Sequence, residues 1–257
     1  MFWNVFKSWA VLFVIGWPLF LQAQLINIES KRMHTDTVRA VFRGDLSTAF
    51  TDNNGKDIFT FRGSLTTQLK SKNRKNIYFF TGDYNRIRSG GADILNNWFF
   101  HLRYNQQWNE TLRFESYLQW QRNSVLDVNR RYLVGAGLRL KLIDRPHMNL
   151  YLGQAYMYEI EQNDELGQEF YFHRHSAYLS ASFSFPESSI SISNTLYFQP
   201  LYQNFSDYRI LEQFKLEVPI VKKLLVFALI DYFYDRITPK GRKQFSSVNS
   251  FGLSIRL

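Results

Sequence analysis

The chain lacks cysteine entirely, and after residue 23 it also lacks any long apolar run. The first absence excludes disulfides, zinc–thiolate sites and lipid attached through cysteine. The second excludes a bundle of membrane-spanning helices, because each such helix needs about 20 consecutive apolar residues. Acidic residues are in the minority, with 22 Asp and Glu against 31 Lys and Arg, so the formal net charge is +9.

Aromatic residues are abundant, with 24 Phe, 15 Tyr and 6 Trp among 257 residues. This content is too high for an intrinsically disordered chain, and the length is ample for a buried core. The mean hydropathy is nevertheless −0.30, a polar average. The fold must therefore accommodate many large apolar side chains in a chain that is polar overall.

Residues 1–23 have the order of a secretory signal peptide. A single positive charge, Lys7, precedes an apolar core from Ala10 to Leu21, and the small residue Ala23 follows. We expect cleavage after Ala23, which makes 24–257 one exported domain; the alternative is an uncleaved membrane anchor. Cleavage leaves 30 basic and 22 acidic residues, a net charge of +8. We expect no nucleic-acid partner for an exported protein.

From about residue 37 onward, apolar and polar residues alternate. In 131–142, for example, Tyr132, Val134 and Leu138 share one face, while Arg131 and Arg139 share the other. Residues i and i+2 lie on the same face only in a strand. The alternation predicts strands at 37–51, 58–70, 76–87, 95–104, 111–123, 131–142, 148–160, 171–185, 190–202, 208–220, 224–235 and 245–257.

Alternating segments of ten or so residues are typical of membrane barrels, whereas strands of soluble sandwiches are shorter. We predict an all-β fold, an antiparallel transmembrane β-barrel of about 12 strands, within a range of roughly 10–14. We expect longer loops at one rim, because the odd-numbered connections, such as 88–94, 161–170 and 236–244, run from five to ten residues and the even-numbered ones from three to six. The chain also ends within a strand, as in a barrel closed by its last strand against its first. Alternation alone does not show which face meets lipid.

Several segments resemble the DUF481 family of outer-membrane proteins: Leu25–Glu29, His101–Asn105, Val134–Arg139, Leu150–Gly153, Tyr156–Glu159, Tyr197–Pro200, Phe205–Arg209 and Tyr234–Asp235. The resemblance spans most of the chain after the signal peptide, and its specificity lies in the order and spacing of these short motifs. It implies a Gram-negative outer-membrane β-barrel. It implies no reaction, since the family is named for an unknown function.

If the apolar face meets lipid, the charged residues of the other face line the lumen. We expect a charged, net basic lumen in which these residues either form structural ion pairs or select ions by charge. The candidates are Arg103, Arg113, Glu115, Arg131, Arg139, Lys141, Glu159, Arg209, Lys215 and Glu217.

Other chemical patterns are weaker. His173 and His175 share a strand face, as metal ligands would, but no acid or cysteine clearly completes a site. His175 and Ser176 are adjacent and so point to opposite faces. Asp231 and Asp235 are about 13 Å apart along a strand, too far for a shared proton. We therefore predict no catalytic residues, no metal and no cofactor.

Three functions remain open. The first is an integral outer-membrane barrel with a structural or small-solute channel role and no catalysis. The second is a membrane-embedded lipid-modifying enzyme, and the third is a soluble periplasmic barrel that binds an apolar ligand. For the first, the expected partners are outer-membrane lipid and, during biogenesis, periplasmic chaperones and the barrel-assembly machinery.

Overall fold

The computed structural model describes residues 39–255, apart from 54–55, 125–127, 164–167, 186, 189, 222–223 and 239–243. The expected signal peptide with its cleavage site and the Leu25–Glu29 motif lie outside the described residues. The described chain contains twelve strands: β1 (Ala40–Asn53), β2 (Lys56–Lys70), β3 (Asn76–Ser89), β4 (Ala92–Gln107), β5 (Leu112–Asn123), β6 (Val128–Arg145), β7 (Met148–Asn163), β8 (Gln168–Ser184), β9 (Ser191–Leu201), β10 (Asn204–Val221), β11 (Leu224–Asp235) and β12 (Phe245–Ile255).

These strands form one antiparallel sheet in the order of the sequence, β1 to β12. The predicted all-β fold of about twelve strands is confirmed, and each predicted segment overlaps one strand. No helix in the described part of the chain is long and apolar enough to cross a membrane.

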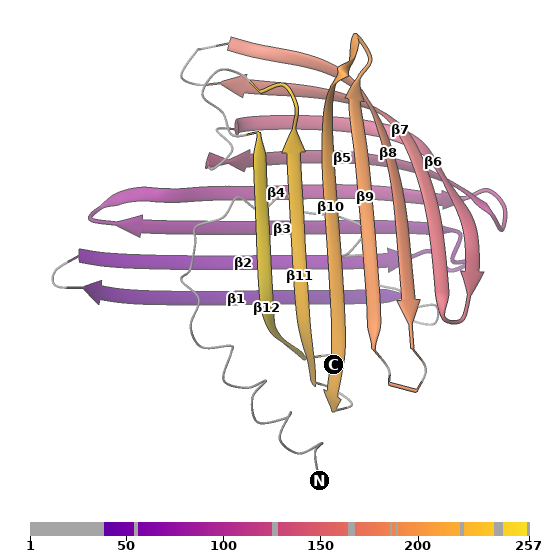
Figure 1. Ribbon diagram of the computed structural model, residues 1–257, viewed down its shortest axis with the longest axis horizontal. Coiled ribbons are helices and arrows are strands. Elements are labelled where there is room, and N and C mark those ends of the chain that lie inside the picture. The colour runs from indigo at the N-terminus through magenta and orange to yellow at the C-terminus, as the bar shows by residue number, and fades with distance from the viewer. Residues whose placement is uncertain are drawn as a thin grey trace.

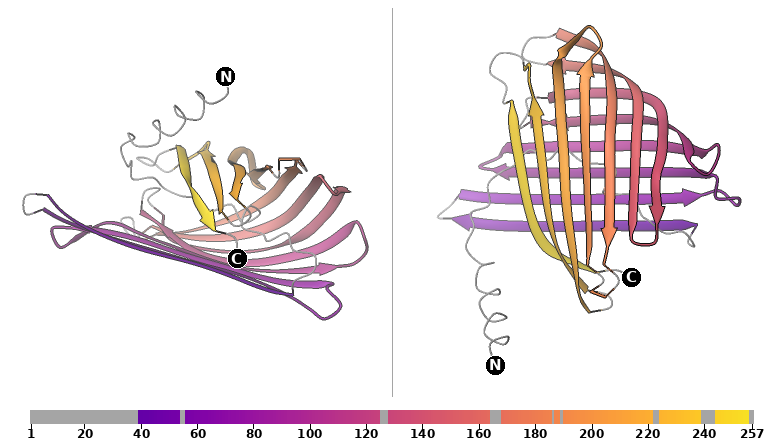
Figure 2. Two further views of the ribbon diagram at one scale, coloured as in Figure 1. Left: turned by 90° about the horizontal axis from the view of Figure 1, so that it is seen from below. Right: turned by 45° about the vertical axis from the view of Figure 1, so that its right-hand side comes forward.

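The sheet is strongly curled. Strands β1–β4 run across the view of Figure 1, whereas β9–β12 run down it. The left view of Figure 2 shows the C-terminal strands, in orange and yellow, turning over the concave side of the sheet. Right-handed twist accumulated from strand to strand produces such a curl. Side chains of strands that are not neighbours in the sheet can consequently meet on the concave face.

The expected closure of the last strand against the first is not found. Among the described residues, β1 pairs only with β2, and β12 pairs only with β11. Each hairpin is specified locally by alternation and a turn, whereas closure requires matching two strands from opposite ends of the sequence. A chain that ends within a strand does not specify that match.

The expected difference between the two rims is also not found. At the rim where we predicted long loops, the connections are 54–55, 90–91, 124–127, 164–167, 202–203 and 236–244, and only the last is long. Polar residues that suggested loops belong to strand ends instead. The predicted connection 88–94, for example, shrinks to Gly90 and Gly91, which both have positive φ, at 56° and 81°, as tight hairpin turns require.

The structure shows which face of the sheet is apolar. Among the described residues, 35 large hydrophobic side chains are exposed, whereas 21 polar or charged side chains are buried. In β6, the outward-facing Tyr132, Val134 and Leu138 are exposed, and the inward-facing Arg131 and Arg139 are buried. A protein folded in water buries its apolar residues instead. The convex face therefore has the polarity of a surface in contact with lipid.

Candidate functional site

A network of buried ion pairs joins β6, β7, β10 and β11 on the concave face; we call it the interior charge network. Nη2 of Arg131 lies 2.6 Å from Oε2 of Glu161, and Nε of Arg131 lies 3.3 Å from Oε1 of Glu159. Nη1 of Arg209 lies 2.8 Å from both Glu159 oxygens. Nε of Arg209 lies 2.8 Å from Oδ2 of Asp235.

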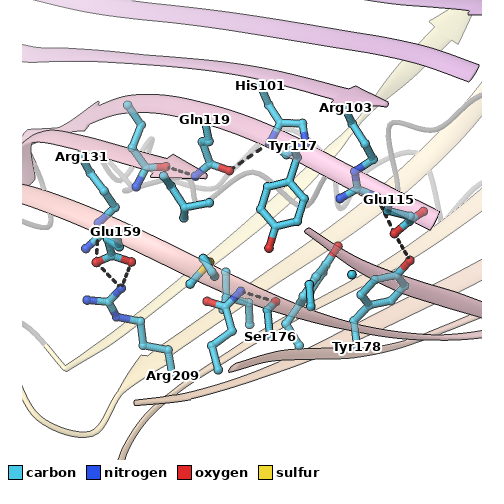
Figure 3. Close-up of a pocket in the computed structure, with 18 of the residues that line it drawn as sticks. His101, Arg103, Glu115, Tyr117, Gln119, Arg131, Glu159, Ser176, Tyr178 and Arg209 are labelled. Carbon is cyan, nitrogen blue, oxygen red and sulfur yellow. Dashed lines mark hydrogen bonds and ion pairs between the residues drawn. The ribbon is translucent and has the colours of Figure 1, made fainter. Parts of the chain in front are cut away.

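The register of the sheet explains part of this network. Arg131 is paired directly with Glu161 across β6 and β7, and Arg209 is paired with Asp235 across β10 and β11. The bond between Arg209 and Glu159 is different, because β8 and β9 lie between their strands. Only the curl of the sheet brings these two side chains together. The interior charge network therefore holds the two sides of the concave face against each other (Figure 3).

A second cluster lies around Glu115 of β5. Tyr178 donates a hydrogen bond of 2.8 Å from its Oη to Oε2 of Glu115, and Nη1 of Arg139 lies 3.5 Å from Oε1. Nη1 of Arg103 lies 3.9 Å from Oε2. The Arg139 guanidinium also lies 4.0 Å from the centroid of the Tyr151 ring, a cation–π contact.

Inward-facing glycines make room for Tyr178 of this cluster and for Tyr117 of β5. A Cβ atom added at Gly135 of β6 would lie 2.3 Å from Cζ of Tyr117. At Gly153 of β7, it would lie 2.0 Å from Cε1 of Tyr178. The two tyrosine rings therefore lie directly over glycine backbone, which lets them lie across the concave face of a tightly curved sheet.

A cavity of about 80 Å³ lies between the interior charge network and the Glu115 cluster. Its lining includes His101, Tyr117, Gln119, Ser176 and Gln199. Nδ1 of His101 lies 3.1 Å from Oε1 of Gln119, and Ser176 accepts a 3.1 Å hydrogen bond from Nε2 of Gln199. Tyr117 points from beneath His101 towards Ser176 (Figure 3). The space suits a few water molecules or a small solute.

The matched family model, described as "Protein of unknown function, DUF481", covers residues 53–256. The chain belongs to the DUF481 family. No curated protein matches it. A solved structure titled "Bacterial polysaccharide outer membrane secretin" has a TM-score of 0.50 and 10% identity, over 85% of this chain and 91% of that chain. This likeness shows the fold of an outer-membrane barrel.

Two further solved structures are similar to this DUF481 chain. A NanC porin has a TM-score of 0.48 and 13% identity, over 86% of this chain and 100% of that chain. The translocator domain of the autotransporter NalP from Neisseria meningitidis has a TM-score of 0.49 and 11% identity, over 90% and 92% of the two chains.

The ten charged residues expected on the inner face separate into two groups. Six are buried on the concave face: Arg103, Glu115, Arg131, Arg139, Glu159 and Arg209. The other four, nearer the strand ends, are half-buried: Arg113, Lys141, Lys215 and Glu217. Within this second group, Lys215 pairs with Glu217 at 2.7 Å, whereas Lys141 pairs with Asp144 at 2.5 Å. The structure therefore brings together the first group, and not all ten residues.

Five buried charges were not among the ten: Glu161, Arg174, Asp207, Asp231 and Asp235. Two of them, Arg174 and Asp207, pair with each other. Nη1 of Arg174 lies 3.1 Å from Oδ1 of Asp207 and 3.2 Å from the carbonyl oxygen of Gln199. Arg174 lies between His173 and His175, which drew attention to the opposite face of β8. The period-two rule alone assigns Arg174 to the same face as Ser176 and Tyr178, and all three are buried.

The buried charges are nearly balanced, in contrast to the basic excess that we expected. Among the described residues, five arginines are buried together with six carboxylates: Glu115, Glu159, Glu161, Asp207, Asp231 and Asp235. The ten expected residues included four of the five buried arginines but only two of the six buried carboxylates, Glu115 and Glu159. Burial explains the balance, because a charge taken out of water must be paired.

His173 and His175 lie on the convex face and contact tyrosines. Nδ1 of His173 lies 2.5 Å from Oη of Tyr156, and Nδ1 of His175 lies 3.2 Å from Oη of Tyr202. The described residues contain no group of three or more His, Cys, Asp or Glu that could hold a metal ion. Ser176 is buried on the other face from His175, so these neighbours form no catalytic pair.

Asp231 and Asp235 contact different partners. Asp235 accepts a hydrogen bond from Nε of Arg209, whereas Asp231 accepts a hydrogen bond from Nε2 of Gln213. Each carboxylate is thus used to pair β10 with β11 rather than to share a proton with the other.

Proposed function

We propose that this DUF481 protein is an integral outer-membrane barrel whose narrow, charged interior passes only small solutes. The observation that carries the proposal is the inverted polarity of the sheet, with 35 large hydrophobic side chains exposed and 21 polar ones buried among the described residues. A soluble periplasmic barrel would leave that apolar surface in water, which is unfavourable.

The dimensions of the interior favour a narrow route. Twelve strands lie between eight-stranded barrels, which side chains fill, and sixteen-stranded open porins. Here the interior charge network crosses the concave face, and the cavity beside it measures about 80 Å³. The nearly balanced buried charges favour weak discrimination between anions and cations.

The proposal places the protein in the outer membrane after removal of residues 1–23. Its partners there are membrane lipid and, during biogenesis, periplasmic chaperones and the barrel-assembly machinery. We propose no catalytic step, since the Ser, His and acidic side chains of the cavity have structural partners of their own.

Membrane integration is tested by washing isolated membranes with urea and by comparing the gel mobility of heated and unheated samples. An integral barrel stays in the membrane fraction and migrates differently when unheated. A protein that is released by urea would contradict the proposal.

Passage of small solutes through the interior is tested by planar-bilayer conductance of the parent protein and of Tyr117→Ala. This variant removes the ring that lies across the cavity. We expect small conductance steps in the parent and larger steps in Tyr117→Ala. Tyr132→Ala is the matched control, because this tyrosine lies on the convex face of β6, and its steps should equal those of the parent. Stable silence of folded parent and folded Tyr117→Ala would reject the channel and leave a purely structural barrel.

A further inference from the structure

The convex face is hollowed by an apolar groove of about 360 Å³ that crosses β3 to β7; we call it the outer groove. The outer groove is also lined by His101, Gln119 and Leu133, whose side chains point to the concave face. The floor of the groove therefore lies at the sheet itself. Its walls are outward-facing side chains: Phe80, Phe100, Leu102, Leu118, Trp120, Tyr132, Val134, Tyr158 and Ile160.

At the end of the outer groove nearer the rim that carries connection 236–244, its lining residues Phe100, Trp120 and Tyr132 pack together, and Trp98 lies beside them. The Trp98 and Trp120 ring centroids are 4.3 Å apart, and Phe100 lies 5.9 Å from Trp120. On the other side, Tyr132 stacks on Trp120 at 5.9 Å with an interplanar angle of 8°. Rings of this kind are enriched where a membrane protein meets the polar part of the bilayer.

Two arginines lie directly beyond these rings. Arg122 follows Trp120 by two residues on β5, and Arg130 precedes Tyr132 by two residues on β6. A β-bulge shifts the register here: Gln121 pairs with Arg131, whereas Asn123 pairs with Val128, so two residues of β6 lie opposite one residue of β5. Arg122 is therefore opposite Asn129 and Arg130, and it is half-buried, while Arg130 is exposed.

Neither arginine makes a hydrogen bond or an ion pair with another described residue. The nearby carboxylate of Asp93 is held by Arg86 at 2.9 Å and by Arg88 at 3.3 Å, and Arg122 is within electrostatic range of the same carboxylate. Like charges on adjacent strands repel each other. An anion between Arg122 and Arg130 would remove that repulsion, and the guanidinium fork fits phosphate oxygens well.

We propose that the Arg122–Arg130 pair and the outer groove together bind one phosphate-bearing membrane lipid. The phosphate group lies between the two arginines, and an acyl chain fills the groove below them. A lipid fits both halves of the site, because the groove opens on the apolar convex face while the cations lie beside its aromatic end. The inference rests on the membrane integration proposed above and assigns the outer face a selective contact with one class of lipid.

Tryptophan fluorescence provides the test, because Trp98 and Trp120 report directly on the site. The protein, purified from membranes, is placed in phosphatidylcholine bilayers that contain a small fraction of brominated phosphatidylglycerol or, in parallel, brominated phosphatidylcholine. Bromine quenches only nearby tryptophan. Subtracting the emission of the W98F/W120F variant isolates the signal of the site.

We expect brominated phosphatidylglycerol to quench the two tryptophans more strongly than brominated phosphatidylcholine does. The binding constant of phosphatidylglycerol relative to phosphatidylcholine should be well above one. Each arginine near an anionic lipid is worth about a fivefold change. Arg122→Gln and Arg130→Gln should therefore each lower the relative binding constant about fivefold. Arg145→Gln is the matched control, because Arg145 is exposed at the opposite end of β6, and it should leave the constant unchanged.

One further variant is expected to raise the relative binding constant rather than lower it, which misfolding would not explain. Asp93→Asn removes the carboxylate that partly neutralises this region and should raise the preference for the anionic lipid. Equal quenching by both lipids in the parent, or an equal loss in Arg145→Gln, would overturn the lipid site while leaving an integral protein. Absence of quenching by either lipid would instead show that the protein is not in the bilayer.

Discussion

Glu159 is the most completely buried charge of the interior charge network, with no exposed surface. Its neighbour on the same face of β7, Glu161, carries the same charge. Arg131 and Arg209 each contact both carboxylates, at distances from 2.6 to 3.8 Å. Each arginine therefore offsets the repulsion between the glutamates as well as its own cost of desolvation.

Glu159→Gln should lower the free energy of unfolding by about 3–5 kcal/mol, because it leaves the buried Arg209 without its strongest partner. The measurement is urea denaturation of the protein folded in detergent micelles, followed by gel mobility of unheated samples. The control is Glu169→Gln at the exposed start of β8, where the carboxylate contacts Gln162 and Tyr171. That variant should unfold at the same urea concentration as the parent; a matching loss would contradict the role given to burial.

At the scale of the strands, the curvature of the sheet depends on glycines in β6 and β7, which have no side chains. Gly135 and Gly153 face the concave side, and their missing side chains are replaced by the rings of Tyr117 and Tyr178. A tyrosine thus covers the backbone of a neighbouring strand. Tyr178 also reaches Glu115, which is 63 residues earlier in the sequence, so the glycines make a contact across the interior possible.

Gly153→Ala should destabilise the protein by about 1–3 kcal/mol, because the new methyl group overlaps the Tyr178 ring. Gly63→Ala is the matched control, since its nearest neighbour would be 3.6 Å away, an ordinary contact. Thermal unfolding of the two variants in the same detergent gives the comparison. Equal melting temperatures would show that Tyr178 can move aside without cost.

The strands were predictable because their signal is local. Alternation located all twelve, and it placed Arg131, Arg139 and Glu159 on one face correctly. It located strand ends less well, because polar residues such as Arg130 and Glu161 continue the ladder beyond the apolar band. Arg174 was missed for a related reason: the histidines beside it drew attention to the convex face.

The interior pairings could not be predicted, because they depend on the curl of the whole sheet. Nothing in the sequence connects Glu159 with Arg209, which are 50 residues apart and on non-adjacent strands. The outer groove is similar, because five strands contribute to it and each contributes only a few residues. Alternation specifies the face on which a side chain lies but not its partner across that face.

At the scale of the molecule, stability is distributed unevenly. The side chains of β1 are largely exposed, and β1 has a neighbour on one side only, whereas β7 lies between two long strands and contributes Glu159 and Glu161 to the interior. Amides of β1 should exchange with deuterium at least about tenfold faster than those of β7. Hydrogen exchange with peptide mass spectrometry measures this, and equal protection would show that β1 gains a second partner in the membrane.

The sequential strand order also has a consequence for how the chain folds. Pairing of neighbouring strands closes only short loops, whereas the bonds from Glu115 to Tyr178 and from Glu159 to Arg209 span 63 and 50 residues. The entropy of closing longer loops delays such contacts. We therefore expect hairpins to assemble first and the interior ion pairs to form last, after the barrier to folding has been crossed. Contacts made that late slow unfolding more than they speed folding, so we expect the charges inside this protein to determine above all how long it stays folded.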